Sequence, residues 1–165
     1  MHYKLLKQPL FICIGIILCL NACIPSNTFE KNISMPKNKW SRDFVPHLEF
    51  DINDTACYYN MYLTMRHTDN YPYSNIWLNI KTLAPGELKF VQTRTEIPLA
   101  QADGKWLGRG MNEIFEITDH QMPLQRNGML KFNRVGRYVV ELQQIMRIDP
   151  LPEVMSVGIR LEKKP

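Results

Sequence analysis

The chain has 165 residues, of which 45% are hydrophobic and 22% charged. This composition is typical of a globular domain and excludes a disordered or collagen-like chain. The formal net charge of +4 is small and its basic residues are scattered, so charge gives no indication of a nucleic-acid partner and we expect none.

Residues 1–22 have the features of a secretory signal peptide. Lys4 and Lys7 give the segment a positive start, and residues 10–20 form an apolar run of eleven without a charge. Such a run is too short to cross a hydrocarbon core of about 30 Å, for which a helix needs about 20 apolar residues. We therefore expect cleavage of the segment rather than a transmembrane span.

The end of this run, Leu20-Asn21-Ala22-Cys23, is similar to a bacterial lipobox, in which the Cys is acylated. The alternatives are an ordinary cleaved signal with a Cys nearby and a signal anchor. Two or three acyl chains hold a protein on a membrane almost irreversibly. Cys23 is therefore predicted to be lipidated and to attach the mature chain permanently to a membrane.

Cysteine usage agrees with this interpretation. Cys13 and Cys19 leave with the signal peptide and Cys23 carries the lipid, so Cys57 is the only free thiol of the mature chain. An intramolecular disulfide is thereby excluded. Cys57 begins a strand-like run, and we expect a small core residue there rather than a nucleophile.

Domain organisation follows from composition. Residues 23–39 are rich in Ser, Asn, Lys and Pro and poor in apolar side chains, which predicts a flexible tether. We expect one folded domain over residues 40–165.

Apolar and polar side chains alternate through most of this domain, which predicts strands. Tyr59, Met61, Leu63 and Met65, for example, fall on one face of a single run. Strands are predicted over 47–52, 58–67, 75–82, 88–95, 113–118, 129–132, 137–148 and 154–162. The turn residues between them have the spacing of an antiparallel β-sandwich, either immunoglobulin-like or jelly-roll-like.

Three segments are less regular. Residues 99–110 and 120–126 are expected to form a short helix or a loop. Helical spacing competes with strand over 137–148, where Val139 and Val140 favour strand. In the run 88–95, the alternation places Leu88 and Phe90 on the core side.

The search for catalytic or metal-binding residues gives little. His47, His67 and His120 stand singly, without the spacing of a zinc site, and each is expected to be an outward strand or loop residue. Asp51, Asn53 and Asp54 offer oxygen ligands but lack the Gly and distal Glu of a calcium loop, so a turn is the better interpretation. No nucleophile motif or phosphate loop is present in the sequence. We expect no enzyme activity, cofactor or metal.

Four aromatic residues form the candidate interaction surface: Tyr71, Tyr73, Trp77 and Trp106. Exposed rings on a β scaffold stack against sugars, which makes glycan binding one hypothesis. The preferred interpretation is packing, because large rings dominate small cores.

Two segments in this region have a distinctive sequence, YPYSNIWL at 71–78 and DGKWLGRG at 103–110. They resemble the gliding motility lipoprotein GldH family of the Bacteroidetes, and the order of other landmarks extends the resemblance over about residues 40 to 162. The resemblance implies an outer-membrane-associated lipoprotein needed for gliding, whose companion components overlap with a secretion machine for adhesins. Members also occur in species that do not glide, so a general envelope or secretion-linked task is possible.

The family carries over one functional position, the lipidated Cys23. No acidic cluster of the kind that sends lipoproteins of this phylum to the cell surface follows Cys23, which favours a periplasm-facing position over surface exposure. Our leading hypothesis is a lipid-anchored, non-enzymatic component that contacts other envelope proteins. A glycan-binding surface module is the alternative, and a hydrolase is the weakest of the three.

Overall fold

The computed structural model describes residues 27–122 and 129–164, and its regular elements are almost all strands. The predicted signal peptide and Cys23 lie outside the described residues. The strands are β1 (Thr28–Ser34), β2 (Lys39–Trp40), β3 (His47–Ile52), β4 (Tyr58–Thr68), β5 (Asn75–Leu83), β6 (Val91–Pro98), β7 (Arg109–Met111), β8 (Ile114–Gln121), β9 (Gly136–Gln144), β10 (Leu151–Pro152) and β11 (Val154–Lys164). One 3-10 turn, η2 (Pro36–Asn38), follows β1.

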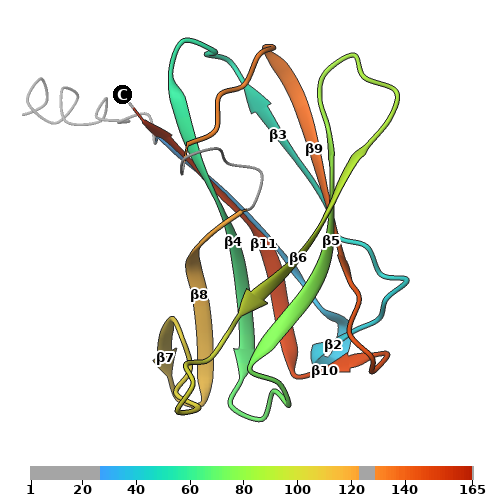
Figure 1. Ribbon diagram of the computed structural model, residues 1–165, viewed down its shortest axis with the longest axis vertical. Helices are drawn as coiled ribbons and strands as arrows, with labels where there is room; N and C mark the ends of the chain where they lie inside the picture. The colour runs from blue at the N-terminus through green and yellow to red at the C-terminus, as the bar shows by residue number, and fades with distance from the viewer. Residues whose placement is uncertain (1–26, 123–128, 165) are drawn as a thin grey trace, which may run out of the picture.

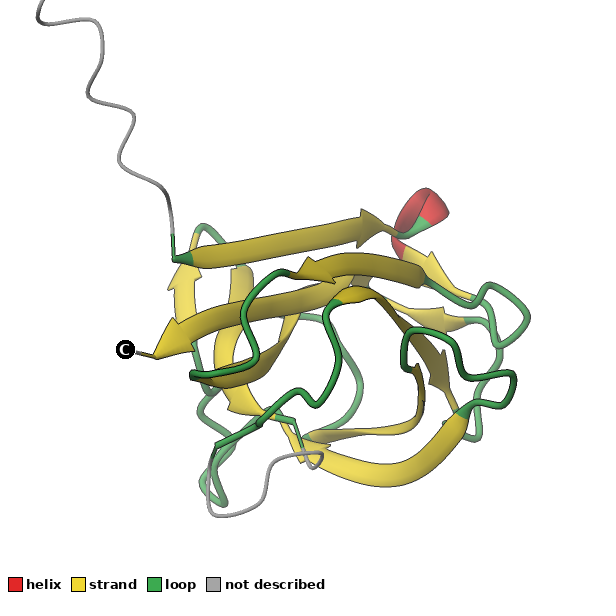
Figure 2. Ribbon diagram, turned by 90° about the horizontal axis from the view of Figure 1, so that it is seen from above, coloured by secondary structure: helices red, strands yellow, loops and turns green. Residues whose placement is uncertain are grey.

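The strands form two antiparallel sheets that pack face to face as a sandwich (Figure 1). The first sheet has the order β1-β11-β4-β8-β7, and the second has the order β3-β9-β5-β6. A short β10-β2 pair accompanies them. Figure 2 shows the start of the described chain and the C-terminus on the same side of the molecule.

The pairing of the eight long strands is nested. The first strand pairs with the last, β1 with β11, and the innermost two, β5 and β6, form a hairpin. Between them, β3 pairs with β9 and β4 pairs with β8. An immunoglobulin-like sandwich places its first strand beside its second. The observed pairing is therefore that of a jelly roll, one of the two architectures predicted.

The core consists of the inward-facing residues of both sheets. On β4 the predicted apolar face is buried, from Tyr59 through Met65, and on β5 the residues Ile76, Leu78 and Ile80 are fully buried. β11, the neighbour of β4 in the first sheet, contributes Val157 and Ile159. The burial of the apolar faces of β4 and β5 confirms that the period-two pattern locates the interior of the sandwich, although Asn60 and Thr64 on the other face of β4 are buried as well.

β1 corrects the predicted domain boundary. Residues 28–34 were assigned to the tether, but they form an edge strand paired with β11 along its whole length. Phe29 and Ile33 pack against the core. The folded part thus begins at Thr28 rather than near Trp40. Only two apolar residues mark this strand in the sequence, because its other side chains face water.

Gly158 explains how β1 is held. It lies on β11 opposite Asn32 of β1 and Thr64 of β4. Because Gly158 has no side chain, the Thr64 hydroxyl reaches across it and donates a hydrogen bond to Asn32 Oδ1 at 2.5 Å. A Cβ at this position would clash with the Lys31 carbonyl oxygen and the Asn32 side chain. The glycine therefore lets three strands share one polar contact.

β6 begins three residues later than predicted. The strand runs over Val91–Pro98, and Ile97 is its only buried residue. Leu88 is 97% exposed and Phe90 is 40% exposed, so the expectation that both face the core is wrong. Residues 84–90 instead form the turn of the β5–β6 hairpin, where Gly86 has a φ of 77°. The alternation in this segment does not match the register that β5 imposes on it.

The remaining segments mostly follow the predictions. The strand interpretation of 137–148 is confirmed by β9 up to Gln144. Residues 129–132 form only an isolated bridge, Leu130 to Tyr59. In the segment 99–110 the structure has a loop with a bridge between Ala100 and Trp106, followed by the start of β7. β8 extends to Gln121, and residues 123–126 of the other irregular segment lie outside the described chain.

Candidate functional site

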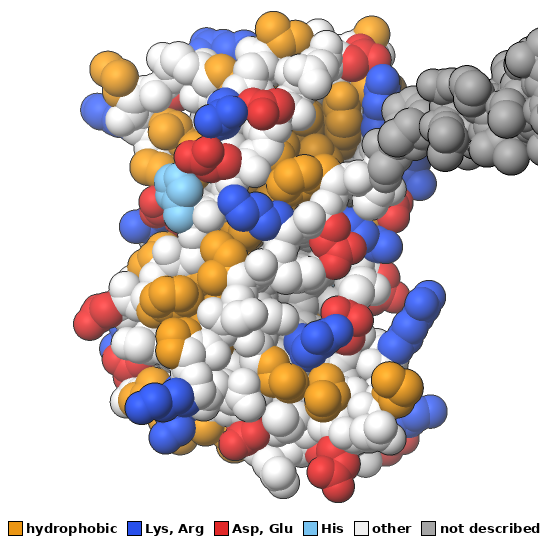
Figure 3. All heavy atoms as spheres, turned by 180° about the vertical axis from the view of Figure 1, so that it is seen from behind, with side chains coloured by type: hydrophobic (Ala, Val, Ile, Leu, Met, Phe, Trp, Pro, Cys, Tyr) orange, Lys and Arg blue, Asp and Glu red, His pale blue; other side chains and the backbone are white. Residues whose placement is uncertain are grey.

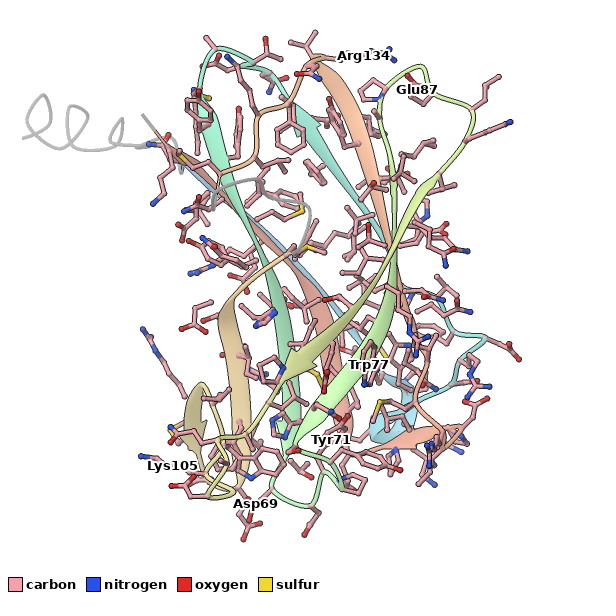
Figure 4. All side chains as sticks on the ribbon, viewed as in Figure 1. Asp69, Tyr71, Trp77, Glu87, Lys105 and Arg134 are labelled. Carbon is pink, nitrogen blue, oxygen red and sulfur yellow. The ribbon has the colours of Figure 1, made fainter. Side chains whose placement is uncertain are left out.

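His67 occupies the centre of a cluster of aromatic rings at one end of the sandwich. We call this end, which lies at the bottom of Figure 4 near Asp69 and Tyr71, the lower end, and the end near Glu87 and Arg134 the upper end. It is fully buried, so its expected outward position is wrong. Its ring centroid lies 4.6 Å from that of Trp106, 5.3 Å from Tyr71 and 5.9 Å from Phe115. Its Nδ1 lies 2.9 Å from the Thr68 carbonyl oxygen. Burial lowers the pKa of His67, so the neutral imidazole is favoured.

Tyr71 is part of this cluster rather than of the surface. Its ring is 3% exposed, and its hydroxyl donates a hydrogen bond of 3.0 Å to the Asn75 carbonyl oxygen. Burial raises the pKa of the phenol. The half-buried Tyr73 meets it edge-on, with centroids 6.0 Å apart. A ring enclosed in this way has no free face for a sugar, so the placement of Tyr71 on an exposed interaction surface is wrong.

Trp106 covers the cluster from a loop. Its indole Nε1 donates a 2.6 Å hydrogen bond to Oδ1 of Asp69, which lies in the connection between β4 and β5. The loop returns to Leu99 through a 2.7 Å bond from the Leu107 amide. Gly108 then adopts a φ of 91°, and a Cβ there would clash with the Glu116 carbonyl oxygen. The contacts of the 103–110 motif therefore hold the loop in place and position the Trp106 ring over the cluster.

Trp77 is not part of the ring cluster around His67. It alternates with the buried Ile76 and Leu78, so its ring lies on the outer face of β5. The guanidinium carbon of Arg94 lies 4.8 Å from the ring centroid, which is cation–π distance. The backbone amide of Trp77 is 3.2 Å from the Met146 sulfur. Figure 4 shows Trp77 on β5, above Tyr71 and Asp69, which lie in the connection that precedes this strand.

The four aromatic candidates thus divide into packing roles. Tyr71, Tyr73 and Trp106 meet at the lower end, whereas Trp77 lies on the outer face of the sheet β3-β9-β5-β6. Tyr73, Trp77 and Trp106 are half-buried and pack against the core. The preferred packing interpretation accounts for their contacts.

The upper end contains a pocket that the sequence did not reveal. Its volume is about 450 Å³, with Phe50, Phe132 and Tyr138 in its wall and Glu87 and Arg134 at its rim. The Phe132 and Tyr138 centroids are 4.6 Å apart. The wall residues come from three separate segments, so only the strand register brings them together. The lining also includes Lys89 and Lys131, so the pocket combines an apolar wall with basic side chains and the ion pair between Glu87 and Arg134.

The rim is held by an ion pair between two turns. Arg134 Nη1 lies 2.7 Å from Glu87 Oε1 and donates a second bond of 3.0 Å to the Pro85 carbonyl oxygen. Figure 4 shows Glu87 and Arg134 together at the upper end, opposite Asp69 and Lys105. These bonds fix the turn of the β5–β6 hairpin to the segment before β9.

Cys57, His47 and His120 are the remaining candidate residues, and each has the following contacts or exposure. Cys57 is half-buried and packs against the core, with its sulfur 3.8 Å from the Asp54 carbonyl oxygen. The Asp54 carbonyl also accepts a 2.8 Å bond from the Tyr59 hydroxyl. His47 is exposed beside Glu49 and Glu141, and His120 is half-buried.

Two further features concern cofactors and membranes. Within residues 27–122 and 129–164, no three His, Cys, Asp or Glu side chains are grouped to hold a metal ion. The part of the chain that the structure describes has no helix with the length and apolar character needed to span a bilayer.

Comparison with known proteins identifies relatives over nearly the whole chain. The family model described as GldH lipoprotein matches residues 27–161. The gliding motility lipoprotein GldH homolog of Christiangramia forsetii is 28% identical over 160 residues, covering 93% of this chain and 94% of the relative. The gliding motility lipoprotein GldH of Flavobacterium johnsoniae is 27% identical over 161 residues, covering 91% of this chain and 96% of the relative.

Proposed function

Because the chain belongs to the GldH lipoprotein family, we propose that it is a lipid-anchored, non-enzymatic component of the gliding motility machinery and its linked secretion system. The observation that carries this proposal is the family match, which spans almost all of the folded part. We place the protein in the bacterial envelope, attached to the outer membrane and facing the periplasm. Its proposed partners are other envelope proteins of the same complex.

The lipobox supports the anchor. Cys23 comes three residues after the end of an apolar run that has the length of the apolar region of a signal peptide, and the first strand begins only five residues later, at Thr28. A body attached so closely to its lipid stays near the membrane surface. This position suits a protein that works by contact with its neighbours in the envelope.

The surroundings of Cys57 support a role in which this thiol does not act as a nucleophile. A reactive thiol needs a neighbouring base or cation that favours the thiolate. Cys57 lies near the Asp54 backbone, the Tyr59 hydroxyl and Lys163, and the ammonium of Lys163 is paired with the Asp54 carboxylate at 2.8 Å. The buried His67 lies in the ring cluster at the other end of β4. Glycan binding is the weaker candidate, because its proposed rings are engaged in packing and no described contact favours it.

Complementation tests the proposal. A strain that lacks the protein should lose gliding or adhesin secretion, and the wild-type chain should restore it. Cys57→Ala should restore it equally, because no covalent step uses the thiol, whereas Cys23→Ala should not. The proposal fails if the deletion strain moves and secretes normally. Its non-enzymatic part fails if Cys57→Ala is inactive at normal membrane levels.

Crosslinking in native envelopes, followed by mass spectrometry, tests the partner claim. An assembly component should give a reproducible set of crosslinks to other envelope proteins, and these should disappear with Cys23→Ala. A lipidated chain that crosslinks to no protein would contradict the assembly role.

A further inference from the structure

Exposed apolar side chains gather at the upper end of the sandwich. The described chain has nine large hydrophobic residues that are exposed, and six of them belong to elements of this end. They are Tyr58, Leu88, Phe90, Val91, Met129 and Val135. Leu88, at 97% exposure, is at the turn of the β5–β6 hairpin. In the view from behind, orange side chains lie at the upper end among blue and red ones (Figure 3).

The hairpin turn combines apolar and basic side chains. Leu88, Phe90 and Val91 surround Lys89, and Lys131 lies nearby with its Nζ 5.5 Å from the Tyr58 ring centroid. The salt bridges of the described residues leave out both Lys89 and Lys131. A long Lys side chain can keep its ammonium among lipid headgroups while neighbouring apolar groups enter the acyl boundary. The turn therefore has the composition of a membrane-interface segment.

This turn is held in one position. The ion pair between Arg134 and Glu87 at 2.7 Å and the Arg134 bond to Pro85 fix residues 85–87 against the segment before β9. The apolar side chains are thus presented outward by a braced hairpin. Patches of exposed apolar groups mark sites of contact with a protein or a membrane.

The start of the described chain is at the same end. The Asn27 carbonyl accepts a 2.8 Å bond from the Lys163 amide, and Thr28 pairs with Glu162. Tyr58, at the start of β4, pairs with Lys164 on the same strand β11. Figure 1 shows this corner and the β5–β6 turn at the upper end. The chain thus enters the domain at the end that carries the apolar patch.

The length of chain before Asn27 limits its distance from the anchor. Cys23 is four residues before Asn27, and four extended residues reach about 14 Å at most. If Cys23 carries the lipid, as in the proposed function, the upper end is held at the bilayer surface. The opposite end, with β7 and the Trp106 loop, then faces away from the membrane.

We propose that the upper end of the sandwich rests on the membrane that holds the lipid, with Leu88, Phe90 and Val91 in the boundary between headgroups and acyl chains. This inference depends on the lipid anchor of the proposed function. It adds a second contact, which fixes the orientation of the body and turns the lower end toward its partners. The short chain before Asn27 favours the bilayer over a protein as the occupant of the patch.

Environment-sensitive fluorescence tests the orientation. The full lipoprotein, with Cys57→Ser and one introduced cysteine carrying the dye NBD, is reconstituted into vesicles of phosphatidylethanolamine and phosphatidylglycerol. Leu88→Cys is compared with Met111→Cys, because Met111 is 78% exposed and apolar but lies in β7 at the other end. We expect a shift to shorter wavelength and quenching by doxyl-labelled acyl chains for Leu88→Cys only. Both sites are exposed, so neither change should disturb folding.

The outcomes separate the two proposals. Mass spectrometry of the reconstituted protein first establishes the lipid on Cys23. With that lipid present, equal emission and no quenching at both positions would overturn the orientation and leave the anchor intact. If the dye at position 88 has the emission of a water-exposed probe in vesicles but shifts to shorter wavelength in native envelopes, the membrane contact would be overturned in favour of a protein contact. A chain without lipid on Cys23 would overturn both proposals.

Discussion

At the scale of single residues, the two sequence motifs are explained by the packing of rings around one buried imidazole. Trp106 is bonded to Asp69, Tyr71 to the Asn75 backbone, and His67 lies between the two rings. Each ring also satisfies its polar atom within the fold, except that His67 Nε2 is buried without a hydrogen-bond partner among the described residues. Tyr71 and Trp106, two of the four candidate surface residues, therefore have structural contacts within the fold.

The hydroxyl of Tyr71 provides a direct test. Tyr71→Phe leaves the ring but removes the 3.0 Å bond, so the Asn75 carbonyl loses its side-chain donor. We expect a loss of about 1 kcal/mol in the free energy of unfolding, measured by urea denaturation. Tyr73→Phe is the matched control and should change stability by less than about 0.5 kcal/mol. Equal effects of the two variants would contradict the assigned role of Tyr71.

His67 makes stability depend on pH. Burial lowers its pKa below the ordinary value of 6.5, so below pH 6.5 the unfolded chain binds a proton that the folded chain does not. Stability should be constant above this pH and fall as the pH drops toward the folded pKa. In His67→Phe this loss should be smaller, with a remainder from His120, whose pKa burial also lowers. Urea denaturation between pH 8 and 5 measures both curves, and parallel curves would refute the assignment.

At the scale of elements, the sequence predicts strands with one buried apolar face well, and strands with few buried side chains poorly. β4 and β5 each have a buried apolar face, and the period-two pattern predicts the apolar core residues of both correctly. It does not predict the burial of Asn60 and Thr64 on the other face of β4. β1 and β6 lie at sheet edges and bury few side chains, and the alternation in their sequences gives little indication of their bounds, unlike that of β3, which is also an edge strand but buries Leu48, Phe50 and Ile52. Their positions depend on pairing with β11 and β5, which a local pattern does not contain.

Sites built from several elements show the same limit. The wall of the upper pocket joins Phe50, Phe132 and Tyr138, which are far apart in the chain. The ring cluster likewise joins His67 to Phe115 and Trp106. His67 itself lies on the same face of β4 as Tyr59, Met61, Leu63 and Met65, so the period-two pattern places it inside. The expectation of an outward position rested on its polar character, and the partners that enclose it come from other segments.

Gly158 tests the docking of β1. Gly158→Ala places a methyl group against Lys31 and Asn32, which should push β1 away and destabilise the fold by about 1–3 kcal/mol. Hydrogen exchange should increase in residues 28–34 more than in β5. Ser156→Ala, on the same strand and also opposite β1, is the control and should leave the exchange of β1 unchanged. Unchanged exchange in both variants would contradict the role of Gly158.

At the scale of the whole molecule, the nested pairing of the jelly roll determines where the chain begins and ends. Pairing of the first strand with the last brings Asn27 and Lys164 to one end of the sandwich. The proposed lipid anchor would therefore act at that end, and the apolar β5–β6 turn lies at the same end. The fold links attachment to orientation, and it leaves the lower end and the outer faces of the sheets for contacts with other proteins.

Lipidation of Cys23 is the claim on which the envelope role and the orientation both depend. Cells grown with an alkyne analogue of palmitate provide the most direct measurement, with mass spectrometry of the N-terminal peptide of the purified protein. We expect label on the wild-type chain, none on Cys23→Ala, and a mature N-terminus at Cys23 bearing a thioether-linked diacylglycerol. An unlabelled wild-type protein that is water-soluble and starts at another residue would contradict the account.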